Sequence, residues 1–176
     1  MQRIVVVGAT GSGKTTLASD IARRLRFPYI EIDAIYWRPN WAPMPEQEFR
    51  QRMDEATHGD RWVVDGNYGK VRDIVWGRAD TLVWLDYPLW LVWWRLLRRS
   101  LGRVFRSEQL WNSNRETVRT MFFSRDSLFL WLFKSYPKQK REYPRLIHQP
   151  EYIHLTLLRF HSPKEVGQWL AKLSLS

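Results

Sequence analysis

The stretch Gly8-Ala9-Thr10-Gly11-Ser12-Gly13-Lys14-Thr15 joins two segments of different periodicity. Before it, Arg3–Val7 is a β-branched run, which is typical of a strand buried in a parallel sheet. After it, apolar residues recur at helical spacing through Lys14–Arg26. A glycine-rich turn between a buried strand and a helix predicts an α/β fold with a parallel sheet.

The same eight residues match the pattern G-x-x-x-x-G-K-[ST], whose chemistry is phosphate binding. Its glycines let backbone N–H groups turn toward phosphate oxygens, and the following helix adds the positive end of its dipole. We expect Lys14 to neutralise the β- and γ-phosphates of ATP, and Thr15 to offer its hydroxyl to Mg2+. The predicted nucleotide-binding residues are Gly8, Ala9, Thr10, Gly11, Ser12, Gly13, Lys14, Thr15 and Thr16. An ordinary glycine turn is the alternative interpretation.

Four more strands, with helices between them, are predicted along the rest of the chain. The strands are Pro28–Ile32, Arg61–Val64, Asp80–Asp86 and Glu151–Leu158; the helices are Glu46–Thr57, Leu89–Leu101, Glu116–Lys134, Lys138–Arg145 and a last one capped by Ser162. Pro137 and Pro144 are expected to interrupt the basic helix between them. Alternating strands and helices predict helices on both faces of the sheet, with ligands at the carboxyl ends of the strands.

Three aspartates, Asp33, Asp65 and Asp86, fall at those carboxyl ends. Asp65 directly follows the apolar segment Trp62–Val64, where a phosphate-loop protein places the carboxylate that holds Mg2+ through water. Asp86, after Leu82–Leu85, is the rival for that role. In a third interpretation neither binds the metal, because Asp-Gly pairs also form plain turns.

Length and composition fit one globular domain spanning 1–176, with 44% hydrophobic and 26% charged residues. The absence of cysteine excludes disulfides, thiolate metal sites and cysteine nucleophiles, and suits the reducing cytoplasm, where we expect the protein. The first residues lead directly into a strand, so no signal peptide is expected. The apolar run Tyr87–Trp94 is shorter than the roughly 20 residues of a membrane helix, so no transmembrane segment is expected.

Basic residues are concentrated in one part of the chain. The segment Arg95–Arg145 contains 13 Lys or Arg and 4 Asp or Glu, in a chain whose net charge is +10. Such a field attracts polyanions, whether nucleotide phosphates, nucleic acid or a lipid surface. Two interpretations are open for Arg95, Arg98 and Lys138–Arg141: surface charge, or part of a patch for nucleic acid or acidic lipid. Trp90, Trp93 and Trp94 are expected to pack in the core, a base-stacking platform being the alternative.

The polar stretch Ser107–Arg115 breaks the helical pattern inside this basic segment and predicts a lid. Phosphoryl transfer depends mostly on positioning and charge neutralisation, and arginines on a closing lid supply charge and exclude water. We therefore predict Arg115 and Arg125 as catalytic residues.

The order of these parts resembles the nucleoside monophosphate kinase and shikimate kinase group of P-loop kinases over nearly the whole chain. The motifs are the P-loop, Asp65-Gly66-Asn67-Tyr68, Arg99-Ser100-Leu101-Gly102-Arg103, Arg125-Asp126 and the tail Leu157–Glu165. The resemblance implies a single P-loop NTPase domain with a five-stranded parallel sheet in the order 2-3-1-4-5, an acceptor-site insertion at about 33–60 and a small helical lid at about 103–126. It also implies that Arg99 stacks on adenine, that Arg103 contacts phosphate and that Arg125 reaches the transferring phosphoryl group.

A narrower resemblance rests on the stretches IDAIYWRPNW at 32–41, WVVDGNY at 62–68, LDYP at 85–88 and NRE at 114–116. They are similar to bacterial proteins described as topology modulation proteins or adenylate-kinase-like ATPases. Adenylate kinases hold the acceptor phosphate with arginines, one of them just after the Asp-Gly segment. Here that stretch reads Asn67-Tyr68-Gly69-Lys70, which argues against a nucleoside monophosphate as acceptor.

Asp33 occupies the position at which shikimate kinase-like enzymes bind acceptor hydroxyls. A carboxylate there can orient an acceptor hydroxyl and take its proton, so Asp33 is predicted as catalytic, with a helix cap or turn as the alternative. The aromatic residues Tyr36, Trp37, Trp41 and Tyr68 either line the acceptor pocket or pack a loop on the core.

The leading functional hypothesis is a kinase that moves the γ-phosphate of ATP, with Mg2+, to a small hydroxyl-bearing acceptor, with nucleoside- and nucleotide-like acceptors among the options. A nucleotide-dependent nucleic-acid-binding or regulatory protein with weak ATPase activity is the second, through the basic segment 95–145. A nucleotide-binding module without useful turnover is the third.

Overall fold

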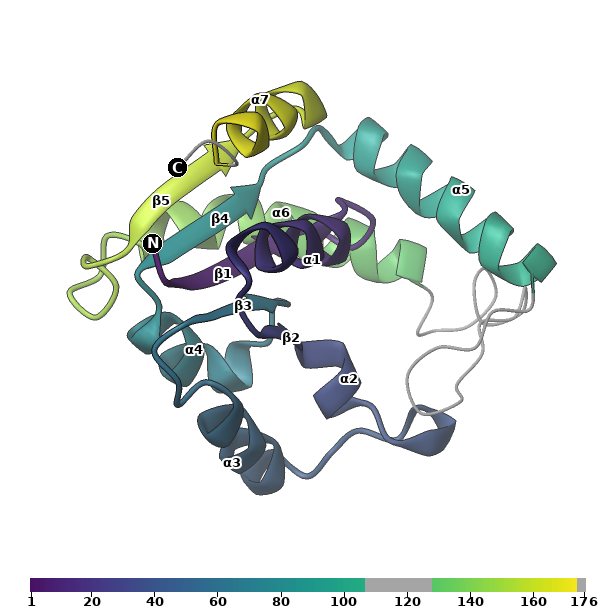
Figure 1. Cartoon of the computed structure of the whole chain (residues 1–176). Coiled ribbons are helices and arrows are strands. Elements are labelled where there is room, and N and C mark those ends of the chain that lie inside the picture. Colours follow the sequence, from purple (N-terminus) through teal and green to yellow (C-terminus); the bar gives the residue numbers. More distant parts are fainter. Residues whose placement is uncertain (107–127, 174–176) are drawn as a thin grey trace.

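The computed structural model describes residues 1–106 and 128–173, except for the side chains of residues 103–106. Five strands, seven α-helices and two short 3-10 helices alternate along this part of the chain (Figure 1). In order they are β1 Arg3–Gly8, α1 Lys14–Leu25, β2 Tyr29–Glu31, α2 Ile32–Tyr36, η1 Pro39–Trp41, α3 Glu46–Ala56, β3 Trp62–Asp65, η2 Gly69–Val71, α4 Arg72–Arg78, β4 Thr81–Leu85, α5 Leu89–Arg106, α6 Leu128–Leu146, β5 Thr156–Phe160 and α7 Pro163–Leu173.

All five strands are parallel and lie in the order β2-β3-β1-β4-β5, which confirms the predicted sheet. β1 is central because its run of β-branched residues can be buried on both faces. Successive side chains of β1 alternate between the faces, so Ile4 and Val6 enter one core cluster and Val5 and Val7 the other.

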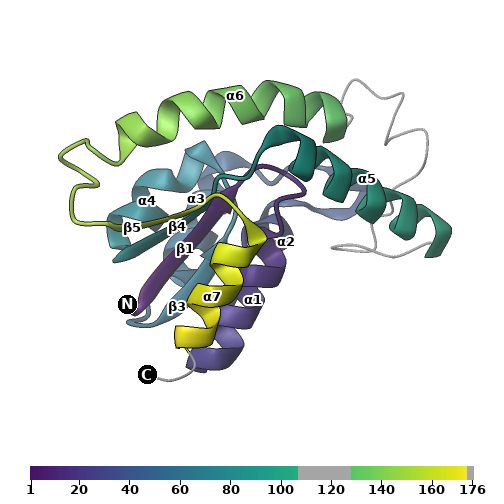
Figure 2. The ribbon, with the colours of Figure 1, turned by 90° about the horizontal axis from the view of Figure 1, so that it is seen from above.

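Helices cover both faces, as expected. α1 and α7 pack on one face, together with Val92 and Leu96 of α5. α3, α4 and the second half of α6 pack on the other, through Phe49, Trp76 and Tyr143. Figure 2 shows α1 and α7 on one side of the strands and α4 and α6 on the opposite side.

The strand register brings the predicted site residues to one edge of the sheet. Asp65 lies beside Val6 of β1 and Glu31 of β2, and Gly8 lies beside Leu85, the last residue of β4. The carboxyl ends of β1, β2, β3 and β4 therefore meet where β1 turns into the glycine-rich loop. The strand order reverses at β1, and α/β sheets bind ligands at such a point.

Three predicted boundaries differ from the structure. β5 begins at Thr156, because the residues before it form turns in which the Leu155 N–H donates to the Tyr152 carbonyl. α6 runs unbroken through both of its prolines, since buried Leu132 and Tyr143 anchor it to opposite core clusters. α5 extends to Arg106, and most of the predicted helix Glu116–Lys134 lies outside the described residues.

Candidate functional site

The glycine-rich loop between β1 and α1 has a backbone that only glycine adopts easily. Gly11 and Gly13 have φ of 82° and 97°, in the left-handed region. A Cβ on Gly11 would come within 2.9 Å of the Leu96 Cβ of α5, so there is no space for a side chain. Successive backbone N–H groups in such a turn form an anion-binding concavity, so the loop fits nucleotide phosphates.

Lys14 opens α1 and extends back over the loop, where its Nζ donates a 3.2 Å hydrogen bond to the Ala9 carbonyl. Burial lowers the pKa of the Lys14 ammonium, and the charge of Arg99 lowers it further. The carboxylates of Asp65 and Asp33 raise the pKa of Lys14 and so oppose this effect. A partly desolvated cation stabilises a bound anion more strongly than one in water, which suits Lys14 to phosphate binding.

Thr15 and Asp65 form the site that fits Mg2+. The Thr15 hydroxyl donates a 2.7 Å hydrogen bond to Asp65 Oδ2, and Asp65 Oδ1 is buried with no hydrogen-bond partner in the described residues. Burial raises the pKa of the Asp65 carboxyl, against the effects of the Thr15 bond and the Lys14 charge. A buried carboxylate with a spare oxygen beside a hydroxyl is a fitting site for a hard cation.

The described residues contain no group of three or more His, Cys, Asp or Glu that could hold a metal alone. Mg2+ in proteins usually keeps several waters and uses one or two carboxylates plus substrate phosphates. The Thr15 hydroxyl and Asp65 fit the small number of protein ligands that Mg2+ takes beside a bound nucleotide, and Thr16, the next residue of α1, is exposed.

Asp86, the alternative candidate for Mg2+ binding, forms ion pairs with side chains outside the glycine-rich loop. Its side chain is 2% exposed, and its two oxygens pair with Lys140 of α6 at 2.8 Å and Arg159 of β5 at 2.6 Å. Arg159 also stacks on the Trp84 ring. Asp86 thus ties α6 and β5 to the end of β4 and leaves no oxygen for a metal.

Asp33 lies in the first turn of α2, whose N-cap residue is Glu31 and not Asp33. Instead, Asp33 Oδ1 accepts a 2.5 Å hydrogen bond from the Tyr68 hydroxyl. The negative charge of Asp33 raises the pKa of both Lys14 and Asp65, so the three side chains share one charged region at the sheet edge. Burial, followed by the Asp33 carboxylate, raises the pKa of Tyr68, which therefore stays a proton donor.

The aromatic residues beside Asp33 form one cluster. Tyr36 contacts Trp37, Tyr68 and Phe49, and Trp37 contacts Trp41. Tyr36 and Tyr68 pack against the buried core of this face, whereas Trp37 and Trp41 do not belong to it. Tyr36 and Tyr68 thus pack on the core and also border Asp33. The two interpretations of these aromatics, a loop packed on the core and a lining of the acceptor pocket, are therefore compatible.

Two residues that touch the loop were missed in the sequence. Arg95 of α5 donates a 3.1 Å hydrogen bond from Nη1 to the Ser12 carbonyl, although the sequence suggested surface charge. The Asn67 side chain accepts a hydrogen bond from the Gly8 N–H at 3.3 Å and donates one to the Gly8 carbonyl. The spacing of Arg95 and Arg99, one helical turn apart, was a usable signal for Arg95. Asn67 stands in the Asp65-Gly66-Asn67-Tyr68 motif, but no sequence signal marked its contact with Gly8.

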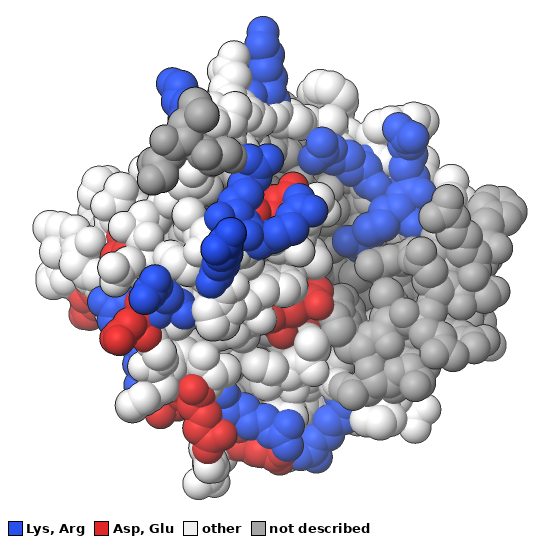
Figure 3. All heavy atoms as spheres, in the orientation of Figure 1, with Lys and Arg blue, Asp and Glu red and all other residues white. Residues whose placement is uncertain are grey.

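The structure describes only a small part of the predicted lid. Arg115 and Arg125 lie outside the described residues, as does most of the predicted lid, and the side chain of Arg103 is not described. Arg99 lies near enough to Lys14 for its charge to lower the pKa of that ammonium. Figure 3 shows basic side chains gathered over α5 and α6, while both signs of charge mix over α3.

The expectation for the α5 tryptophans is wrong. Trp90, Trp93 and Trp94 are 69%, 37% and 50% exposed, and the buried face of α5 carries Val92 and Leu96 instead. The side of α5 that carries Leu96 is buried because it packs against the glycine-rich loop at Gly11. No helix in the described ranges is both long and apolar enough to cross a membrane.

Comparison with known proteins supports this interpretation of the loop and sheet. The model of the ATPase family associated with various cellular activities (AAA) matches residues 4–64, which include the glycine-rich loop and β3 up to Val64. No curated protein matches the chain.

Solved structures match nearly the whole chain. A shikimate kinase from Bacteroides thetaiotaomicron has a TM-score of 0.58 at 17% identity, over 99% of this chain and 97% of its own. A shikimate kinase from Acinetobacter baumannii in complex with shikimate has a TM-score of 0.58 at 18% identity, over 98% and 90%. A gluconokinase from Sinorhizobium meliloti 1021 has a TM-score of 0.52 at 18% identity, over 99% of this chain and 94% of its own. By its loop and its sheet order, this chain has the P-loop kinase fold.

Proposed function

We propose that this protein is a phosphotransferase that moves the γ-phosphate of ATP to a small hydroxyl-bearing acceptor. The observation that carries the proposal is that the hydrogen-bonded pairs Thr15–Asp65 and Tyr68–Asp33 lie with Lys14 at the carboxyl edge of the sheet. A cation for the phosphates, a carboxylate for Mg2+ and a second carboxylate for a hydroxyl are the parts that this reaction needs.

Each of these residues has a distinct role. The loop Gly8–Thr15 binds and orients the phosphates, and Lys14 offsets their negative charge. Thr15 and Asp65 would hold Mg2+, which would supply further charge neutralisation at the phosphates. Asp33, oriented by Tyr68, accepts a hydrogen bond from the acceptor hydroxyl and takes its proton as the oxygen bonds to the γ-phosphorus. The bond from that phosphorus to the β–γ bridging oxygen breaks, and ADP leaves.

Basic residues above the loop complete the proposed site. Arg99 lies near Lys14 and, with Arg103 of the same helix, supplies positive charge beside the nucleotide. We assign Arg115 and Arg125 to the lid, where they would reach the transferring group and exclude water. Preorganised charge of this kind stabilises a transition state whose charge lies on phosphoryl oxygens.

The names of the similar structures support a small-molecule acceptor. They include shikimate kinases, one of them in complex with shikimate, and a gluconokinase. The nucleic-acid hypothesis receives no such support. In addition, Lys138 and Lys140, which the sequence offered for a nucleic-acid patch, pair with Glu142 and Asp86.

The test is ADP release from Mg–ATP, measured for the purified protein with a panel of nucleosides, nucleotides, sugars, hydroxy acids and small alcohols. We expect at least one class of hydroxyl compound to raise ADP release well above the basal rate and to appear as its phosphate ester. Stimulation by DNA or RNA, with no small acceptor active, would replace the proposed function by the nucleic-acid one.

A further inference from the structure

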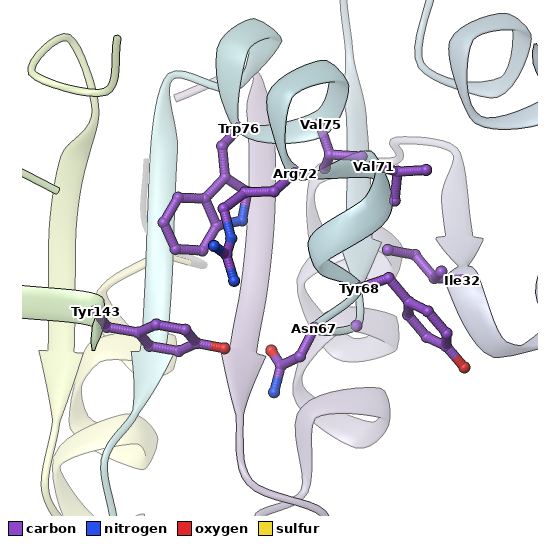
Figure 4. A pocket seen from close by; sticks show the side chains of 9 residues that line it. Ile32, Asn67, Tyr68, Val71, Arg72, Val75, Trp76 and Tyr143 are labelled. Carbon is purple, nitrogen blue, oxygen red and sulfur yellow. The ribbon is translucent and has the colours of Figure 1, made fainter. Parts of the chain in front are cut away.

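The two ends of α6 place their apolar residues differently. Near the C-terminal end, the Tyr143 ring packs edge to face on the Trp76 ring, and both are buried (Figure 4). The cavity beside them holds about 10 Å3, which is room for a single water. At the N-terminal end, Leu130, Trp131 and Phe133 are 47%, 60% and 52% exposed. The start of α6 therefore presents large apolar side chains to solvent.

α5 carries a second exposed apolar stripe. Trp90, Trp94 and Leu101 follow one another at intervals of four and seven residues, which places them on one side of the helix. All three are exposed, while Val92 and Leu96 form the buried side. A helix at the surface of a globular protein normally turns an apolar face to the core and a polar face to water. The exposed stripe of α5 is therefore a candidate contact surface.

The exposed parts of the two helices meet. The Trp93 ring of α5 contacts the Phe129 ring of α6 edge to face, with 6.3 Å between the centroids. Phe133 lies one helical turn after Phe129 on the same side of α6, and Leu130 directly follows Phe129. Figures 1 and 2 both show the start of α6 beside α5. Exposed apolar side chains thus flank the contact on both helices and form one surface, the α5–α6 surface.

Basic side chains lie within the same surface. Arg98 lies four residues after Trp94 and three before Leu101, and Lys134 lies four residues after Leu130, so each shares the side of its apolar neighbours. Both cations are exposed. α5 contains no acidic residue, and α6 contains one, whereas each helix contains five Lys or Arg. The α5–α6 surface therefore combines apolar side chains with a positive charge that these helices scarcely offset.

This combination fits an anionic lipid surface. Trp, Phe and Leu side chains enter the boundary between headgroups and acyl chains, while Arg and Lys extend their charged ends to the lipid phosphates. A second copy bound through the same surface would bring two sets of cations together without counter-charges. Nucleic-acid bases stack on aromatic rings and gain less from exposed aliphatic residues such as Leu101 and Leu130.

We propose that this protein binds the surface of an anionic membrane through α5 and the start of α6. Trp90, Trp94 and Phe133 enter the lipid boundary. Arg98 and Lys134 contact the lipid phosphates. None of these residues has a role in the nucleotide site, so membrane binding goes beyond the proposed phosphotransfer and does not depend on it.

The test is co-sedimentation of the full chain with lipid vesicles. Vesicles of phosphatidylcholine and phosphatidylglycerol in equal parts are compared with vesicles of phosphatidylcholine alone. We expect binding to the anionic vesicles, and binding at least about tenfold weaker to the neutral ones, because anionic headgroups attract the basic residues. Equal binding to both kinds of vesicle, or binding to neither, overturns the proposal.

Two double variants locate the surface. Trp90→Ser with Trp94→Ser should weaken binding to the anionic vesicles by about 10- to 100-fold, since two large apolar side chains are lost. Arg98→Gln with Lys134→Gln should weaken it by about tenfold and remove most of the preference for anionic lipid. All four side chains are exposed, so the unfolding midpoints should stay at the wild-type value. Should the tryptophan variant fail to fold, the charge variant and the lipid comparison still decide.

Ile153→Ser and Lys172→Gln are the matched controls, because both side chains are exposed and lie outside α5 and α6. They should bind the anionic vesicles as the wild type does. Vesicle binding that survives both double variants, or that the controls lose to the same extent, overturns the assignment to the α5–α6 surface.

Two results would replace the membrane by another partner. If vesicles do not bind but single-stranded DNA or RNA does, and Trp90→Ser with Trp94→Ser abolishes that binding, the surface belongs to nucleic acid. If vesicles do not bind but the chain self-associates in analytical ultracentrifugation, and the same variant is monomeric, the surface belongs to a second copy. Either result overturns the proposal and leaves phosphotransfer standing.

Discussion

The Thr15 hydroxyl donates a 2.7 Å hydrogen bond to Asp65 Oδ2, which joins the first turn of α1 to the end of β3. The bond leaves the second oxygen of Asp65 buried and without a partner in the described chain. An unsatisfied buried carboxylate oxygen destabilises the folded protein until a cation or donor reaches it. This unfavourable contact is the kind of feature that functional sites retain.

Replacing Asp65 tests that relationship through stability. Because burial raises the pKa of Asp65 above its usual 3.8, the folded protein binds more protons than the unfolded chain between 3.8 and the raised value. The contribution of Asp65 to stability therefore falls as pH rises through this window. Asp65→Asn removes that titration, so the variant should be more stable than the wild type at pH 7, and this advantage should shrink toward pH 4. Denaturant unfolding at both pH values measures it.

The same Asp65→Asn protein should lose Mg2+-dependent turnover, by about 100-fold or more, as removal of one electrostatic stabiliser does. Nucleotide affinity should fall far less, since the loop and Lys14 remain. A variant that keeps wild-type turnover would exclude Asp65 from the metal site.

Asp86→Asn should have the opposite effect on stability. Asp86 is buried against Lys140 and Arg159, and its replacement leaves two cations whose side chains are 38% exposed, so water screens part of their charge. The loss of stability should therefore lie below the value of about 3–5 kcal/mol for a fully buried pair. The turnover of the protein that still folds should depend on Mg2+ as in the wild type. Unfolding midpoints and Mg2+ titrations of turnover provide the measurements, and a selective loss of Mg2+ dependence would return the metal role to Asp86.

Lys14→Ala should abolish turnover, by about 100- to 1,000-fold, without lowering the unfolding midpoint. The reason is that burial already disfavours the Lys14 charge, so its removal relieves a desolvation cost. Lys138→Ala, an exposed lysine of α6, is the control and should behave as the wild type. Wild-type ADP release by the Lys14 variant would refute the phosphate-binding role.

Asp33→Ala should separate transfer from hydrolysis. It should remove acceptor-stimulated ADP release and leave nucleotide affinity and basal hydrolysis nearly unchanged, because water needs no orienting carboxylate. Tyr68→Phe, which removes the donor to Asp33, should lower stimulated release by about tenfold or more. Steady-state kinetics with acceptor and direct nucleotide titration measure the two effects, and an intact acceptor response in Asp33→Ala would reassign Asp33 to a local role.

Arg95→Met should weaken nucleotide binding by about tenfold, since Arg95 fixes the loop through the Ser12 carbonyl. Arg98→Met, an exposed neighbour on the same helix, is the matched control. Titration with Mg–ADP compares the two. Equal affinities would show that the loop holds its shape without α5.

Much of the fold could be predicted because its signals are local. The alternation of β-branched strands and helices predicted a parallel sheet, and the resemblance to P-loop kinases implied the strand order that is observed. The α5 tryptophans were misplaced because periodicity shows that a helix has an apolar face but not which side packs. Val92 and Leu96 are buried because that side meets the glycine-rich loop, a contact between distant segments.

The sequence by itself determined the phosphate loop, since eight consecutive residues contain its whole chemistry and its flanking periodicities contain its context. It also brought Asp33, Asp65 and Asp86 to one edge, because parallel strands end on the same side. Only the tertiary structure distinguished them. Asp86 is paired by Lys140 and Arg159, Asp65 keeps a free oxygen, and Asp33 is bonded by Tyr68. Burial and pairing depend on side chains distant in sequence, so no local pattern records them.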